Sequence, residues 1–198
     1  MIASNPPVAT TSMPAEVRAA LLERLEPLSA AERELLRSAA ACGRSFDIGV
    51  LAAASGRPIL AIERALRRAC ALQLLEPDRS VRGRFSFRHA LTREAIYGEL
   101  VAYRVRPLHR AIASVLETAP GMSRHTVEEL AYHWWAAGDR KRGSRYCEEA
   151  GDRAGALHAE EQALVHYERA LSLLDGRTRA HARVADKIRR IRSHRSTA

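Results

Sequence analysis

Two incompatible hydrophobic periodicities meet at His89, and this junction constrains the fold more than any other feature of the sequence. Phe85 and Phe87 alternate with polar side chains, which is the period of a half-buried strand. From Ala90 onward the apolar residues fall at helical spacing instead. A short strand is therefore predicted to run directly into a helix at His89.

Helix signals precede this strand. The spacing of apolar residues predicts helices over residues 14–27, 29–42, 47–54 and 59–72. Ser29 and Glu32 form a capping box for the second helix, and Asp47 can cap the third. The first helix is expected to turn one apolar face inward, made of Val17, Leu21, Leu25 and Leu28. The fourth is expected to bury Ile59, Ile62, Leu66 and Ala69 or Cys70.

A β-hairpin is predicted after these helices. Residues 74–76 and 84–88 have strand character, and turn-forming Asp78, Ser80 and Gly83 lie between them. Helices followed by a hairpin are the order of a winged-helix domain. The predicted fold class is therefore mainly α and begins with a winged helix, three helices plus a β-hairpin wing.

The chain beyond His89 reads as helical, with helices over 91–100 and 108–116 and a break at residues 120–123. A second module then alternates small and large residues as tetratricopeptide-like antiparallel helical hairpins do. These residues are Leu130, Ala131, Trp134, Gly138, Asp139, Gly143, Tyr146 or Cys147, and Ala150. Gly143 and Ala163 occupy equivalent positions only 20 residues apart, so the repeats are irregular.

This organisation divides the chain into four parts: a disordered N-terminus over 1–12, a winged-helix module with a helical arm over 13–119, tetratricopeptide-like repeats over 120–176, and a basic C-terminal helix over 177–198. The last part carries a thin apolar stripe, Ala182, Ala185, Ile188 and Ile191. It resembles a truncated repeat helix more than a lipid-binding or nucleic-acid-binding helix, because the stripe lacks aromatic anchors.

The formal net charge of +9 comes from two segments. Residues 57–106 carry 11 basic and 5 acidic side chains, and residues 177–198 carry 8 and 1. The other segments are close to neutral or slightly acidic. Only these two segments could therefore form a basic binding surface.

DNA binding by the winged helix is the alternative function. The helix over 59–72 would enter the major groove and present Arg64, Arg67 and Arg68, and the wing would place Arg82 and Arg84 on phosphates. Against this function, Glu63 is placed to pair with Arg67. The helix also has no outward Asn, Ser or Thr in its first turns. A solvated or protein-facing basic surface is favoured.

The sequence has few catalytic signals. It contains no GxxxxGK[ST] phosphate loop, no H-E-x-x-H motif and no GxSxG elbow. Cys42, Cys70 and Cys147 are far apart and are expected to be buried, reduced thiols. No segment has the length and apolarity of a membrane span, and the N-terminus has no signal-peptide pattern, so a non-enzymatic, metal-free, cytoplasmic protein is expected.

Residues 13–175 resemble the region that follows the ATPase core in large bacterial STAND-type signal-transduction ATPases, the LuxR-linked or adenylate-cyclase-linked regulators. The resemblance is carried by MPAEVRAALLERLEPLSAAERELLRSAAACGRSFDIGVLAAASG, by RFSFRHALTREAIY, by Leu108 with His109, and by ELAYHWWAAGD. It implies a regulatory module that contacts a protein partner through its repeats and an ATPase domain in cis or in trans. No cofactor is expected in this chain, and ATP or ADP would act only through that missing ATPase module.

The resemblance also implies a role for one candidate site residue, and the residues themselves suggest others. His89 would donate an N–H to a nucleotide phosphate in a complete assembly; the alternative is that it caps the junction of strand and helix through a backbone hydrogen bond. Trp134, Trp135 and Tyr146 are the candidate partner-binding residues. Helical spacing indicates that at least one of the two tryptophans packs inside instead.

Overall fold

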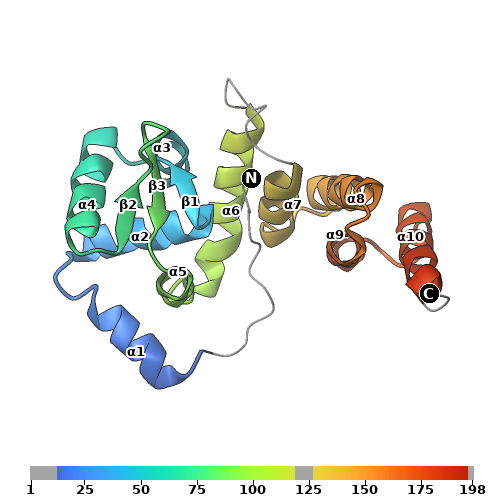
Figure 1. Cartoon of the computed structure of the whole chain (residues 1–198). Helices are drawn as coiled ribbons and strands as arrows, with labels where there is room; N and C mark the ends of the chain where they lie inside the picture. Colours follow the sequence, from blue (N-terminus) through green and yellow to red (C-terminus); the bar gives the residue numbers. More distant parts are fainter. Residues whose placement is uncertain (1–12, 119–126, 196–198) are drawn as a thin grey trace. The chain divides into compact units, whose positions relative to one another are not determined.

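The computed structural model describes residues 13–118 and 127–195, and in these ranges the chain is mainly helical, with ten helices and one three-stranded sheet (Figure 1). Two compact units divide between Val115 and Leu116. The expected disordered N-terminus, residues 1–12, and the expected chain break over 120–123 lie outside the described residues.

The first unit contains most of the elements. They are α1 (Ala15–Glu23), α2 (Ala30–Cys42), β1 (Ser45–Asp47), α3 (Ile48–Ser55), α4 (Ile59–Ala71), β2 (Leu75–Pro77), β3 (Arg84–Phe87), α5 (Ala90–Tyr97) and most of α6 (Ala102–Thr118). The predicted capping box is confirmed: the Glu32 amide donates to Ser29 Oγ, and the Ser29 amide donates to the Glu32 carboxylate. Asp47 caps α3 by accepting from the Gly49 amide.

The predicted hairpin is also confirmed, but it belongs to a larger sheet. The strand order is β1–β3–β2, and both neighbours run antiparallel to β3. Strand β1 was not predicted, because its three residues lie between the end of one helix and the cap of the next and are too few to show alternation. Figure 1 shows the strands beside α2 and α4, and contacts join β1 to α2 and β2 to α4.

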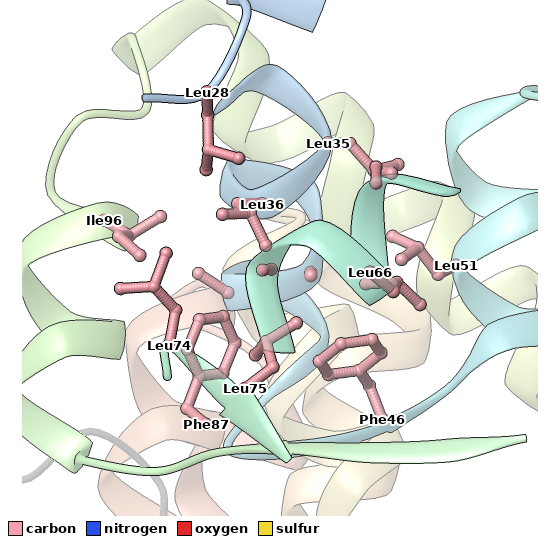
Figure 2. Close-up of a cluster of buried hydrophobic side chains, with 14 of the residues drawn as sticks. Leu28, Leu35, Leu36, Phe46, Leu51, Leu66, Leu74, Leu75, Phe87 and Ile96 are labelled. Atoms are coloured by element: carbon pink, nitrogen blue, oxygen red, sulfur yellow. The ribbon is translucent and has the colours of Figure 1, made fainter. Parts of the chain in front are cut away.

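The core of this unit forms between the inner face of the sheet, α2 and α4 (Figure 2). Phe46 pairs with Phe85 across the sheet, and the fully buried Phe87 pairs with Leu75. From α4, Ile62, Leu66 and Ala69 point inward. Ile59 was expected to join them, and that prediction is wrong: it is 48% exposed, because the buried stripe of α4 starts one turn later.

The first helix is shorter and less buried than its sequence predicts. None of the residues of α1 is buried, and Val17 is 41% exposed. Leu25 and Leu28 are buried as expected, but they follow the end of the helix. Arg18 holds α1 in place from the outside by an ion pair of 2.6 Å with Glu99.

The two helices after β3 also differ from the expected bounds. Helix α5 ends at Tyr97 rather than near residue 100, and α6 begins at Ala102, before Pro107. The prediction started this helix after Pro107, since proline lacks the amide of a regular helical turn. The backbone hydrogen bond that Pro107 cannot make lies in the first, mostly exposed stretch of α6.

The second unit holds the end of α6 and four further helices: α7 (Val127–Ala136), α8 (Arg140–Ala156), α9 (Glu160–Leu173) and α10 (Arg179–Arg195). Their contacts show alternating directions. The start of α8 meets the end of α9 at Leu173, so these helices are antiparallel. Helices α8 and α10 run parallel, since Glu148 pairs with Arg183 and Asp152 with Lys187.

Two glycines let α8 approach its neighbours closely. A Cβ added to Gly143 would lie 3.0 Å from the Trp134 carbonyl oxygen and 2.5 Å from Leu173 Cδ1. A Cβ added to Gly151 would lie 2.5 Å from the ring of Tyr167. The absence of a side chain at these two positions therefore sets the spacing of α7, α8 and α9.

The Gly143→Ala substitution is expected to destabilise the second unit by about 1–3 kcal/mol, because backbone of α7 as well as a side chain of α9 must move. Gly155→Ala, in the same helix with nothing within 4 Å of an added Cβ, is the matched control and should stabilise by about 0.5–1 kcal/mol. Urea unfolding monitored by tryptophan fluorescence reports this unit selectively, since Trp134 and Trp135 are the only tryptophans. Equal effects of the two substitutions would contradict the close approach.

Candidate functional site

The outer face of α4 carries three arginines in two different states. Arg64 and Arg67 are exposed, and in the described part of the chain neither has a hydrogen-bond or ion-pair partner. The pairing of Glu63 with Arg67 that the sequence allows is not formed there. Arg68 is engaged: it donates to the Pro27 carbonyl at 2.6 Å. Two of the three predicted arginines are therefore free to meet a ligand.

The hairpin adds two arginines on other surfaces. Arg82 lies exposed between β2 and β3. Arg84 lies in β3, partly buried, on the sheet face opposite Phe85, and it is paired in register with Asp47. Asp47 caps α3, and no ion pair joins it to Arg84. This outer face of the sheet is polar, since it carries Asp47, Arg84, Ser86 and Glu76.

His89 is the N-cap residue of α5 and is exposed. Its side chain makes no capping hydrogen bond; only its carbonyl takes part, by accepting from the Arg93 amide. Beside it, Leu91 is 52% exposed. The His89 imidazole is therefore exposed to solvent. This exposure is compatible with binding a ligand and equally with having no partner.

A polar cluster lies buried behind this junction. His109 is fully buried with its Nε2 2.9 Å from the Tyr97 hydroxyl, and Arg93 is 7% exposed and donates from Nε to the Ala40 carbonyl. Burial, and then the charge of Arg93, lower the pKa of His109 from 6.5 to about 4. The imidazole is therefore neutral near pH 7.

The two tryptophans of α7 have different environments. Trp134 is fully buried, and the Arg142 guanidinium lies 4.5 Å from the centre of its ring. Trp135 is partly exposed and donates from Nε1 to Ser172 Oγ at 3.1 Å. Of the two, only Trp135 reaches the surface where a partner could contact it.

Tyr146 is partly buried and belongs to an ionic cluster. Its hydroxyl donates to Glu117 Oε1 at 2.6 Å, and Arg145 stacks 4.4 Å from its ring. Arg142 and Arg145 both lie within ion-pair distance of Glu117. This cluster joins the last turn of α6 to α8 inside the second unit, and sequence analysis missed it because Glu117 and Arg142 are 25 positions apart.

The basic C-terminal helix is largely neutralised by its own unit. Glu148 accepts from Arg183 at 2.6 Å and from Lys187 at 2.9 Å, and Lys187 also reaches Asp152. The other ion pairs of this segment join Arg192 to Glu168, Arg177 to Asp175, and Arg189 and Arg190 to Asp186. In the described part of this segment, most of the basic side chains are therefore paired with carboxylates.

The apolar face of α10 also differs from the predicted stripe. Val184 and Ile188 are buried against α8 and α9, with Ile191 packed beside them, whereas Ala182 is exposed. Ile188 and Ile191 of the predicted stripe therefore pack as expected, and Val184 is buried where Ala182 was expected, because the larger β-branched side chain buries more surface.

The described residues contain no cluster typical of a metal site. In residues 13–118 and 127–195, no group of three or more His, Cys, Asp and Glu side chains could hold a metal ion. The three cysteines are free thiols, one buried and two partly buried. Burial raises the pKa of Cys42 and of Cys147 to about 12, so neither thiol ionises near neutral pH.

Acid should loosen the contact of α10 with α8. Hydrogen bonds from Arg183, and then from Lys187, lower the pKa of Glu148 from 4.5 to about 2 against the opposing effect of partial burial. Because the folded pKa is depressed, this contribution to stability is present above about pH 4.5 and is lost as the pH falls toward 2. Glu148→Gln should lower stability at pH 7 by on the order of 1 kcal/mol and flatten that pH dependence.

The measurement is thermal unfolding followed by tryptophan fluorescence between pH 2 and pH 7. Glu149→Gln is the neighbouring control, since Glu149 is 45% exposed and, among the described residues, pairs only with Arg153, one turn away. It should change stability by about 0.5 kcal/mol or less. A Glu148 variant with the pH profile of the parent would show that α10 does not depend on this carboxylate.

Comparisons with known proteins add no identity to these sites. No family model, no characterised protein and no solved structure matches the chain. Among the described residues, no helix is both long enough and apolar enough to cross a membrane. The function must therefore be argued from the side chains and their arrangement.

Proposed function

We propose that this chain is a non-catalytic regulatory module of a bacterial STAND-type ATPase, one that acts in signalling or transcriptional regulation by contacting proteins. In this proposal the first unit is a winged helix and the second a short tetratricopeptide-like array. The ATPase module would be carried elsewhere, in cis or in trans, and would supply the binding of ATP or ADP.

The order and packing of the first unit support the winged-helix assignment. Helices α2, α3 and α4 pack on one another, and the β2–β3 hairpin follows directly. The additional strand β1, between α2 and α3, completes the small sheet of such a domain. A cap at Ser29 and another at Asp47 define where two of the helices begin.

The arrangement of α7 to α10 is the observation that carries the proposal of a protein-interaction module. Each helix packs on its neighbour in sequence, with alternating directions and with residues lacking large side chains, such as Gly143, Gly151 and Ala163, at the contacts. Arrays of this kind present an extended surface rather than an enclosed pocket, and they bind proteins with it.

His89 would be the link to the nucleotide. It is exposed at the start of α5, and its side chain does not cap the helix. In a complete assembly its imidazole would donate to a nucleotide phosphate. This role comes from the resemblance described above and from its exposure.

The proposal is tested by mixing the chain with the phosphate-loop ATPase module of a regulator of this class and measuring phosphate release. We expect no turnover by the chain alone and a change in turnover on mixing. His89→Ala should weaken the effect of the chain on nucleotide affinity, whereas Arg153→Gln, on α8, should not. Turnover by the chain alone, or no effect on mixing, would contradict the proposal.

A second candidate function is DNA binding through α4 and the hairpin. The observation that favours it is the exposure of Arg64 and Arg67 without ion-pair partners. In a gel shift at two salt concentrations, DNA binding by this face would weaken steeply with salt. The slope of the logarithm of the binding constant against the logarithm of the salt concentration would fall in magnitude by about 0.9 for each phosphate contact removed. Arg64→Gln with Arg67→Gln should then reduce both affinity and slope, and Arg177→Gln should not.

A further inference from the structure

The second unit contains a half-buried guanidinium without a carboxylate. Arg169 lies on α9, and in the described part of the chain no Asp or Glu pairs with it. Its Nη1 is buried and has no hydrogen-bond partner. Burial lowers the pKa of Arg169 from its usual value. A charge withdrawn from water in this way is costly unless another group compensates it.

Two aromatic rings of α7 compensate it in part. The Arg169 guanidinium lies 4.9 Å from the centre of the Trp135 ring and 5.8 Å from that of Tyr132. Such contacts stabilise the positive charge through the face of each ring, but the rings accept no conventional hydrogen bond from the N–H groups of the guanidinium. The stacking therefore holds the planar guanidinium in one orientation and leaves its edge without an acceptor.

A second unpartnered polar group lies one turn away on the same helix. His166 is 8% exposed, and its Nδ1 has no hydrogen-bond partner. Burial, and then the charge of Arg169, lower the pKa of His166, against an opposing effect of Glu128. Glu128 therefore lies near the imidazole, but it does not pair with Arg169.

The surroundings define which ligand would suit this position. Arg140, at the start of α8, donates to the Leu173 carbonyl at the end of α9 and is engaged. One free cation matches a singly charged carboxylate better than a phosphate dianion. Val165, one turn before Arg169, is 43% exposed and offers an apolar contact beside it.

We propose that the face formed by α7 and α9 binds an acidic segment of a partner protein, with a carboxylate of that segment accepting from Nε or Nη2 of Arg169, the guanidinium nitrogens that are not buried, and an apolar side chain lying on Val165. The inference rests on the proposed function, since it names the chemistry of the partner. Trp135 and Tyr132 act as positioning residues, because they orient the guanidinium and do not bind the carboxylate.

The test is a titration of the full chain with the capped peptide Leu-Glu-Glu-Leu-Glu-Glu, followed by nitrogen-15 NMR. The Trp135 indole N–H and the Arg169 Nε–H report the site directly. Saturable shifts of these two signals are expected, and the capped peptide Leu-Gln-Gln-Leu-Gln-Gln should produce none. Arg169→Gln should weaken binding about tenfold or more, and Arg153→Gln should leave it unchanged.

Arg169→Lys is the second variant, since it keeps the charge and loses the planar fork; it should bind with intermediate affinity. Absence of saturable shifts, equal shifts at many arginines, or unchanged affinity of Arg169→Gln would overturn the proposal. Tighter binding of inorganic phosphate at the same two signals would overturn the choice of a carboxylate. An effect on ATP turnover without peptide binding would support the proposed function and overturn only this inference. Peptide binding without an effect on ATP turnover would support this inference and contradict the proposed function.

Discussion

The first unit depends on the pairing of one four-residue strand with both of its neighbours. Strand β3 hydrogen-bonds to β1 on one side and to β2 on the other, so it joins the segment between α2 and α3 to the segment after α4. Its inward residues, Phe85 and Phe87, meet Phe46 with ring centres 6.2 and 6.0 Å apart. The helices pack on the inner side of this small sheet, and the exposed His89 follows where the strand ends.

The second unit is held by a different balance of forces. Its helices are joined by a core rich in alanine, in which each residue buries little surface. The helices are packed closely instead of being separated by large side chains. Ion pairs then connect helices that are two apart in the array, such as α8 with α10. The same arrangement places α7 beside α9, where Trp135 and Arg169 meet.

Local signals in the sequence predicted most of the elements. The capping box at Ser29, the cap at Asp47 and the hairpin around Gly83 each depend on residues within a few positions, and all three are present. Strand β1 could not be predicted in this way, because its identity as a strand comes from pairing with residues about 40 positions later. The exposure of Ile59 likewise depends on what covers the start of α4, which its own periodicity does not contain.

The candidate sites show the same limit. The sequence places Trp134 and Trp135 side by side, but only the packing of α8 and α9 decides that the first is buried and the second borders Arg169. Arg169 and Glu117 carried no sequence motif, and their roles come from partners on other helices. The resemblance to STAND-type regulators supplied a context for His89, and the comparisons neither support nor oppose it.

The glycines of α8 restrict which positions of such an array can be substituted during evolution. Gly143 and Gly151 have no side chain, and this allows the short distance between neighbouring helix axes. Almost any replacement at these two positions therefore pushes helices apart. Surface positions such as Val165 can vary without that penalty. Recognition of new partners can therefore diversify on the outside while the spacing of α7, α8 and α9 is inherited unchanged.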